Sequence, residues 1–173
     1  MNDVVAFLRG VMPRGKNAVK MADVRQMLGG NGFGDVRTWI QSGNIALRTD
    51  WDAVATAERI QVLLRAHLQV DLPVIVKTPA QLQEILEQNP FSGSVYDEKR
   101  VFYALCNAPL ADPKDLSGQD YGEEQLAILP QAAYFYIPGD ASRSRLGNAF
   151  LEKKLGQVLT TRNGNTLRKM MDF

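Results

Sequence analysis

Apolar residues follow strand and helix patterns in the first half of the chain, and they predict six elements. The run Val4-Val5-Ala6-Phe7-Leu8 is typical of a buried strand, and Met21, Val24 and Leu28 repeat at helical spacing before a glycine stop at 29–32. The predicted elements, in order, are a strand at 4–8, a helix from 21 or 22 to 28, strands at 36–41 and 45–49 around the turn 42–44, a helix with the apolar stripe Val54, Ala57, Ile60, Leu64 and Leu68, capped by Asp50 or Asp52, and a strand at 73–77.

The order strand, helix, strand, strand, helix, strand is that of the ferredoxin-like unit, in which two helices cover one face of a four-stranded antiparallel sheet. Short connections between these elements favour the same arrangement. The strands alternate in direction, so the loop after the first strand and the turn of the hairpin emerge at the same end of the sheet. We therefore expect residues 10–20 to lie near residues 41–44.

The second half predicts a degenerate copy of this unit. Thr78-Pro79-Ala80-Gln81 is a helix start, so 79–88 forms a linker helix. Strands are predicted at 100–106, 125–129 and 134–137, a loop with or without a short helix at 109–120, and helices at 145–155 and 166–171. The predicted fold is α+β with antiparallel sheets, and one ferredoxin-like subdomain at 1–78 and a second at 79–173 form one compact unit.

Composition limits the functional classes. The chain has 173 residues, 45% of them hydrophobic, which is enough to fill a core. No apolar run approaches the length of a membrane span and no signal peptide is visible, so a cytoplasmic location is expected. The single Cys106 is expected to be buried at a strand end, and with one histidine in the chain no metal site or cofactor is predicted.

Charge is unevenly distributed although the net charge is only +1. Residues 1–40 hold six Lys and Arg against three Asp and Glu, and residues 141–173 hold seven against two. Residues 90–140 hold three basic against eight acidic residues. Such segregation has two explanations, an anion site or solvated faces with salt bridges between segments.

The segment Gly10-Val-Met-Pro-Arg-Gly-Lys16-Asn17 differs by one residue from the phosphate-binding loop G-x-x-x-x-G-K-[ST]. Asn17 has no hydroxyl for magnesium, the next helix starts only near Met21, and no carboxylate ends the strand at 36–41. These departures disfavour an NTPase. They favour a basic connection that needs glycine at positions 10 and 15 for unusual backbone angles.

Several segments occur in order over nearly the whole chain and resemble the bacterial family known as domain of unknown function 1697. The resemblance implies two ferredoxin-like subdomains but no activity, since none is established for the family. The matching segments are Leu8-Arg9-Gly10, Gly15-Lys16-Asn17, Lys20-Met21-Ala22-Asp23, Gly32-Phe33, Val36-Arg37-Thr38, Ile40-Gln41-Ser42-Gly43-Asn44, Asn89-Pro90-Phe91, Glu152-Lys153-Lys154-Leu155-Gly156 and Thr160-Thr161-Arg162-Asn163.

Two departures from the family pattern stand out. The family loop more often reads Gly-Ile-Asn-Val-Gly-Gly-Lys-Asn, whereas Met12, Pro13 and Arg14 replace its middle here. The family usually has Trp where this chain has Gly164. If that Trp is a stacking platform, this chain lacks it, and if it only packs, the change loosens the last helix.

The leading hypothesis is an anion-binding module for a phosphorylated or nucleotide-like ligand, because Lys and Arg supply charge and amides supply direction. Each polar residue also has a structural explanation, since Asn and Gly serve turns and caps and Arg162 can pair with a carboxylate. The candidate ligand-binding residues are Arg9, Lys16, Asn17, Lys20, Gln41, Asn44, Arg162 and Asn163.

Three other functions are considered. Nucleic-acid binding has weak support, because the central strands of the first sheet offer only Phe7 as an aromatic side chain. An enzyme acting on a phosphorylated substrate would use Lys16 or Arg162 as an electrostatic stabiliser, yet no acid/base pair is visible and catalytic residues stay unknown. A protein-interaction module, as a monomer or homodimer, would use edge strands of the sheets.

Overall fold

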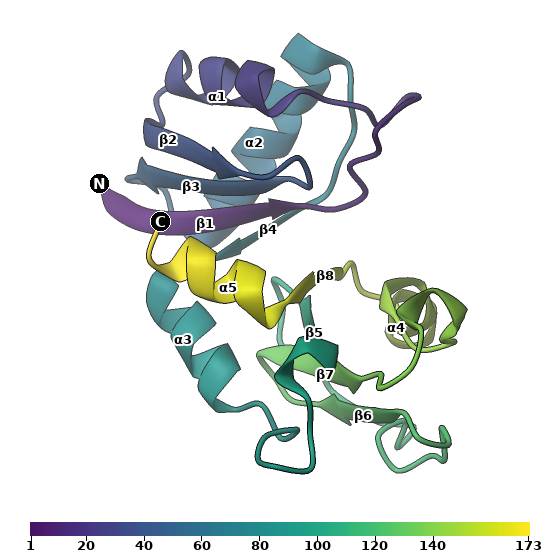
Figure 1. Ribbon diagram of the computed structural model, residues 1–173. Coiled ribbons are helices and arrows are strands. Elements are labelled where there is room, and N and C mark those ends of the chain that lie inside the picture. Colours follow the sequence, from purple (N-terminus) through teal and green to yellow (C-terminus); the bar gives the residue numbers. More distant parts are fainter. The chain divides into compact units, whose positions relative to one another are not determined.

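The computed structural model describes all 173 residues and contains two four-stranded antiparallel sheets and five α-helices (Figure 1). The chain divides into two units, the first made of Met1–Ala80 with Met170–Phe173 and the second of Gln81–Lys169. The division differs from the predicted one chiefly at the end of the chain, because the last four residues group with the first unit.

The first unit has the predicted order of elements, and its sheet has the strand order β2-β3-β1-β4. The helices α1 and α2 cover one face of this sheet (Figure 1). The elements are β1 Asn2–Leu8, α1 Met21–Gly29, β2 Gly34–Trp39, β3 Asn44–Thr49, α2 Ala53–Leu68 and β4 Val74–Lys77.

The core of the first unit follows from the alternation of side chains along β1. Val4, Ala6 and Leu8 share the face that the helices cover, and they pack in one buried cluster with Val24 of α1 and Ile60 of α2. Burial of such side chains removes apolar surface from water and stabilises the unit.

One residue of the predicted apolar stripe of α2 was placed wrongly. Val54 is 67% exposed, whereas the buried face of α2 consists of Thr56, Ala57, Ile60, Leu63 and Leu64. Positions three apart drift around the axis by about 60° per step, so Val54 lies roughly a third of a turn from the middle of the buried face.

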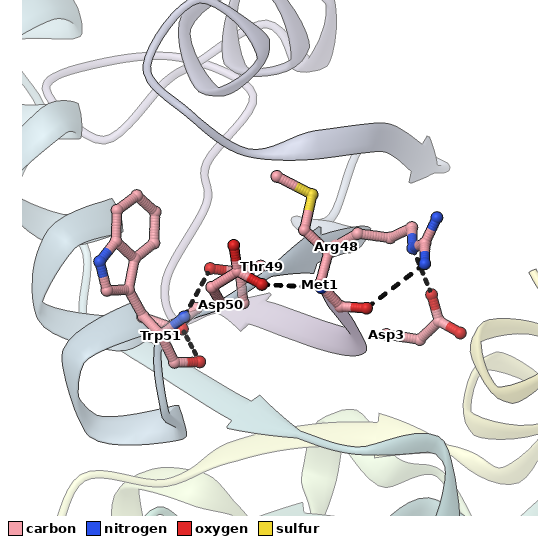
Figure 2. Close-up of polar contacts among 7 residues, drawn as sticks. Met1, Asp3, Arg48, Thr49, Asp50 and Trp51 are labelled. Atoms are coloured by element: carbon pink, nitrogen blue, oxygen red, sulfur yellow. Dashed lines mark hydrogen bonds and ion pairs between the residues drawn. The ribbon is translucent and has the colours of Figure 1, made fainter.

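The cap of α2 is Asp52, whose Oδ1 accepts a hydrogen bond of 2.8 Å from the amide of Ala55. Asp50 instead pairs with the terminal amino group of Met1 at 2.7 Å, and Arg48 reaches Asp3 at 3.4 Å (Figure 2). The charged groups at this end of β1 and β3 therefore pair with one another.

The second unit has a sheet with the strand order β6-β7-β5-β8, which is the order of the first sheet with each number raised by four. One helix, α4, lies between β7 and β8, while α3 precedes the sheet and α5 follows it. The elements are α3 Pro79–Glu87, β5 Val101–Leu105, β6 Gln125–Ile128, β7 Ala132–Tyr136, α4 Asn148–Leu155, β8 Thr160–Asn163 and α5 Gly164–Met171.

Two predictions for the second half need correction, while the stretch 109–120 is a loop without a helix, one of the two forms predicted for it. Helix α4 begins at Asn148 rather than at Arg145, and residues 141–143 form a separate 3₁₀ turn before it. Strand β8 was not predicted at all. Its side chains are polar, and only its pairing with β5, with Tyr103 opposite Arg162, makes it a strand.

The two sheets confirm the predicted fold class, an α+β protein with two ferredoxin-like subdomains. Cys106 is buried as expected, with 1% of its surface exposed and its thiol 3.5 Å from the carbonyl oxygen of Gln131. None of the helices has the length and hydrophobicity that crossing a bilayer requires.

Candidate functional site

The connection from β1 to α1 and the hairpin turn between β2 and β3 meet at one end of the first sheet, as the strand order predicts (Figure 1). The amide of Leu8 donates to the carbonyl of Gly43 at 2.8 Å. The Nε2 group of Gln41 donates to the carbonyl of Val19 at 2.7 Å. Backbone and side-chain bonds thus tie the basic connection to the turn.

The connection itself is a closed loop, which we define as the basic loop, residues 9–20. The amide of Met12 donates to the carbonyl of Asn17 at 3.1 Å, and that of Ala18 donates to the carbonyl of Gly15 at 3.1 Å. Gly10 and Gly15 have φ values of +85° and +88°, which other residues rarely adopt. The helix begins four residues beyond Asn17, so the loop does not place a helix terminus where a phosphate-binding loop would.

Lys20 occupies the N-cap position of α1, and no side chain caps the helix there. An N-cap is usually Ser, Thr, Asp or Asn, whose oxygen satisfies a free amide of the first turn. A lysine cannot accept that bond, and it adds a positive charge to the positive end of the helix dipole. This residue choice is unfavourable for helix stability and adds a positive charge to a first turn that also carries the carboxylate of Asp23.

A cavity of about 440 Å³ opens beside this helix start, in the first unit. The basic loop, the first turn of α1, the hairpin turn and the end of α2 all contribute to its wall. The lining residues are Met12, Pro13, Ala18, Val19, Lys20, Asp23, Gln41 and Leu68.

Two lysines at this end of the sheet form no ion pair. Lys16 and Lys20 are exposed, and neither forms an ion pair. The arrangement contrasts with the opposite end of β1, where Arg48 pairs with Asp3. Exposed lysines without an ion pair attract anions from solution.

Three other candidate residues of the first unit form hydrogen bonds within the fold. Asn44 is fully buried, and its Nδ2 group donates to Ser42 Oγ at 2.9 Å and to the carbonyl of Trp39 at 3.2 Å, which holds the turn closed. The backbone of Arg9 donates to the carbonyl of Pro73 at 2.9 Å. Asn17 lies in the basic loop, half-buried, and its carbonyl closes that loop.

Arg162 and Asn163 belong to β8 of the second unit. The Arg162 guanidinium donates to Thr160 Oγ1 at 2.7 Å and to the carbonyl of Thr161 at 3.0 Å, and burial lowers the pKa of this group to about 10. Asn163 Oδ1 accepts from the amide of Thr166 at 2.8 Å and so caps α5. The structure thus brings Lys20 and Gln41 to one cavity, with Lys16 and Asn17 in the adjoining basic loop, and describes Arg162 and Asn163 in another unit.

Six cavity residues were not among the candidates: Met12, Pro13, Ala18, Val19, Asp23 and Leu68. Leu68 ends α2, and in this topology the end of the second helix lies at the same end of the sheet as the basic loop, so the strand order alone could have identified it. An acidic residue is common in the first turn of a helix, so the sequence provides no reason to assign Asp23 to a binding site as well.

The segments 152–156 and 160–163 that resemble the family have a structural role around α4. Glu152 accepts from Asn148 Nδ2 at 2.7 Å and from the amide of Leu159 at 3.2 Å. Asn148 Oδ1 in turn accepts from Thr161 Oγ1 at 3.0 Å, and its Nδ2 group also donates to the carbonyl of Leu159 at 2.8 Å. These bonds fix the return of the chain from α4 to β8.

A second cavity of the first unit, of about 370 Å³, has cations that are already engaged. Arg48 pairs with Asp3 at 3.4 Å, and Arg37 pairs with Asp35 at 3.3 Å while its guanidinium lies 5.3 Å from the ring centre of Phe173. This cavity is therefore less suited to an added anion than the one at Lys20.

Comparison with known proteins gives a fold neighbour and a family. No curated protein matches the chain. The conserved bacterial protein SP0830 from Streptococcus pneumoniae has a similar structure, with a TM-score of 0.74 and 20% sequence identity over 98% of this chain and 97% of that one. At this identity the similarity concerns the fold. The family model of proteins of unknown function DUF1697 matches residues 1–134, and the chain therefore belongs to the DUF1697 family.

Proposed function

We propose that the first unit is an anion-binding module that holds a phosphorylated small molecule in the cavity at the start of α1. The observation that carries this proposal is the position of Lys20. It lines the cavity, forms no ion pair, and occupies the N-cap position of α1, where a residue that caps the helix usually stands.

An anion at this position would be stabilised in two ways. The N-terminus of α1 carries partial positive charge, and Lys20 adds a full charge beside it. Together they stabilise a phosphate group more than either would alone. Bound anion would also offset the unfavourable placement of a lysine at an N-cap, which gives a physical reason for that residue.

The other groups have supporting roles in the proposal. Lys16, at the exposed part of the basic loop, raises the local concentration of anions by long-range attraction. Gln41 is oriented by its bond to Val19 and directs a polar atom toward the ligand. We further propose a cytoplasmic location, where phosphorylated metabolites are present and a lone Cys106 stays reduced.

The test exploits the opposite effects that Lys20→Ser should have on stability and on binding. Serine is a good N-cap, so we expect the free energy of unfolding to rise by about 0.5–1 kcal/mol, measured by urea denaturation. We expect the affinity for inorganic phosphate, measured by calorimetry at low salt, to fall at least about tenfold, which is about 1.4 kcal/mol.

Lys114→Ser is the matched control, because Lys114 is an exposed lysine of the second unit and does not line the cavity. It should leave phosphate affinity unchanged. Phosphate binding that survives Lys20→Ser, or no measurable binding to the native chain, would refute the proposal. A loss of stability in Lys20→Ser would show that the lysine is there for structural reasons.

A further inference from the structure

We infer that the ligand of this cavity is a ribonucleoside monophosphate; this rests on the proposed function and names the ligand class for the same site. The cavity combines three chemically different regions: the cation Lys20, the hydrogen-bond acceptors of Asp23 and Gln41, and an apolar wall that includes Met12 and Leu68. In this inference the cation holds the phosphate group, the acceptors bind the ribose hydroxyls and a base amine, and the apolar wall contacts the base.

The cavity is larger than a small inorganic anion alone would occupy. At about 440 Å³ it lies within the range of roughly 300–1,000 Å³ that is typical of small-molecule sites. A phosphate ion next to Lys20 would leave most of this volume to water. The ligand therefore has a body in addition to its anionic group.

The two acceptors require hydrogen-bond donors on that body. The Nε2 group of Gln41 is committed to the carbonyl of Val19 at 2.7 Å, which fixes the amide and leaves its Oε1 oxygen to accept. The carboxylate of Asp23 only accepts, and neither oxygen has a partner within the protein. An acyl or alkyl phosphate has no donors for these groups, whereas ribose hydroxyls and a base amine supply them.

The apolar wall requires a flat or apolar surface. Met12 is 52% exposed, and Pro13 beside it is exposed as well, so both side chains are available to a ligand. A thioether packs well against an aromatic ring because it is polarisable and flexible. A sugar phosphate without a base would leave this wall in contact with water, which is unfavourable.

The charges of the cavity limit the number of phosphate groups. Lys20 is the only cation in its lining, and Asp23 places a negative charge in the same lining. A diphosphate or triphosphate would bring additional negative charge close to that carboxylate, and like charges at short distance repel. One phosphate group at Lys20, with the ribose toward Asp23, matches this distribution.

Calorimetric titration of the native chain with AMP, 2′-deoxy-AMP, ribose 5-phosphate and inorganic phosphate tests the inference. We expect AMP to bind at least about tenfold more tightly than inorganic phosphate, and to bind more tightly than ribose 5-phosphate and 2′-deoxy-AMP. Asp23→Ala should weaken AMP at least about fivefold without weakening inorganic phosphate, whereas Lys20→Ser should weaken both.

Glu58→Ala is the control, because Glu58 is an exposed acid of α2 outside the cavity and should not change either affinity. If phosphate binds with dependence on Lys20 but AMP binds no more tightly, the nucleotide inference is overturned and the anion site stands. If neither binds, both are overturned. Equal weakening of AMP and phosphate by Asp23→Ala would show that this residue acts only on the fold of the helix, and would also overturn the inference.

Discussion

The connection after the first strand of each sheet occupies the same place in the topology, yet the two connections have opposite charge. Residues 9–20 of the first unit contain four basic residues and no acidic one, whereas residues 106–124 of the second unit contain one basic and five acidic residues. The first connection leads into α1, and the second reaches β6 without a helix.

In both units a backbone amide at or after the end of the first strand donates to the neighbouring hairpin. In the first unit the amide of Leu8 donates to the carbonyl of Gly43 at 2.8 Å, and in the second the amide of Leu110 donates to the carbonyl of Pro130 at 2.9 Å. The fold therefore dictates the position of the connection but not its chemistry. Function in such a fold has to be argued from the side chains of one site.

The largest effect is expected where the basic loop touches the turn. A methyl group at Gly43 would lie 2.7 Å from Leu8 Cβ and 3.0 Å from Val11 Cγ2, at a φ of +85° that disfavours alanine. Gly43→Ala should lower the free energy of unfolding by about 2–4 kcal/mol, measured by urea denaturation. Gly15→Ala, where φ is +88° but no atom lies within 4 Å, should cost only about 1 kcal/mol. Equal effects would mean that the contact with the turn contributes nothing.

Residues 106–124, which we call the acidic connection, depend for their conformation on one carboxylate, that of Asp112. It accepts from the amide of Leu116 at 2.7 Å, and from the amide and the hydroxyl of Ser117 at 2.9 and 2.7 Å. Asp112→Ala should therefore lower the free energy of unfolding at pH 7 by about 1–2 kcal/mol. Glu123→Ala, an exposed acid with no such bonds, is the control and should change it by less than about 0.5 kcal/mol.

The effect of Asp112→Ala should depend on pH. Burial raises the pKa of the Asp112 carboxyl, but the hydrogen bonds from Ser117 and Leu116 lower it by more, so its pKa lies below the ordinary value. A lowered pKa in the folded state stabilises the protein above about pH 4 and loses that contribution as the pH falls through the folded value. The difference between the native chain and Asp112→Ala should thus shrink in acid, and a constant difference would contradict this explanation.

The smallest effect is expected from adding positive charge to the acidic connection. Gln119→Lys combined with Glu123→Lys adds two exposed lysines to the connection that already contains Lys114. In the Lys20→Ser background this double substitution should not restore phosphate affinity, with a change below about threefold, because no helix begins in that connection. Recovery of binding would show that net charge alone, without a helix start and a cavity, is sufficient.

The first unit could be predicted almost completely from its sequence, and the second only in part. Strong apolar periodicity and glycine stops defined α1 and the hairpin, so only the bounds and the exposed Val54 differ from the prediction. The polar strand β8 has no periodicity, because its pairing with β5 is a tertiary interaction that local pattern does not record. The same limit applies to the connection after β5, where the sequence left a short helix open and the hydrogen bonds of Asp112 organise the chain without one.

The candidate site, too, could be predicted from the sequence only in part. Residue type and topology were sufficient to place Lys20 and Gln41 at one end of the sheet. They could not show that the Asn44 amide donates to Ser42 and Trp39 within the protein. An asparagine in a turn and an asparagine in a binding site have the same sequence pattern. The contribution of Leu68 was missed although the strand order already places the end of α2 at this end of the sheet.

The single thiol of the chain makes the opening of the second unit measurable by chemical labelling. Cys106 lies at the start of the acidic connection with 1% of its surface exposed, so a thiol reagent reaches it only when the second unit opens. The rate of labelling under native conditions counts such openings, and it does so without an introduced probe. If a substitution in the basic loop of the first unit changed the rate of this labelling in the second unit, the stabilities of the two units would be coupled.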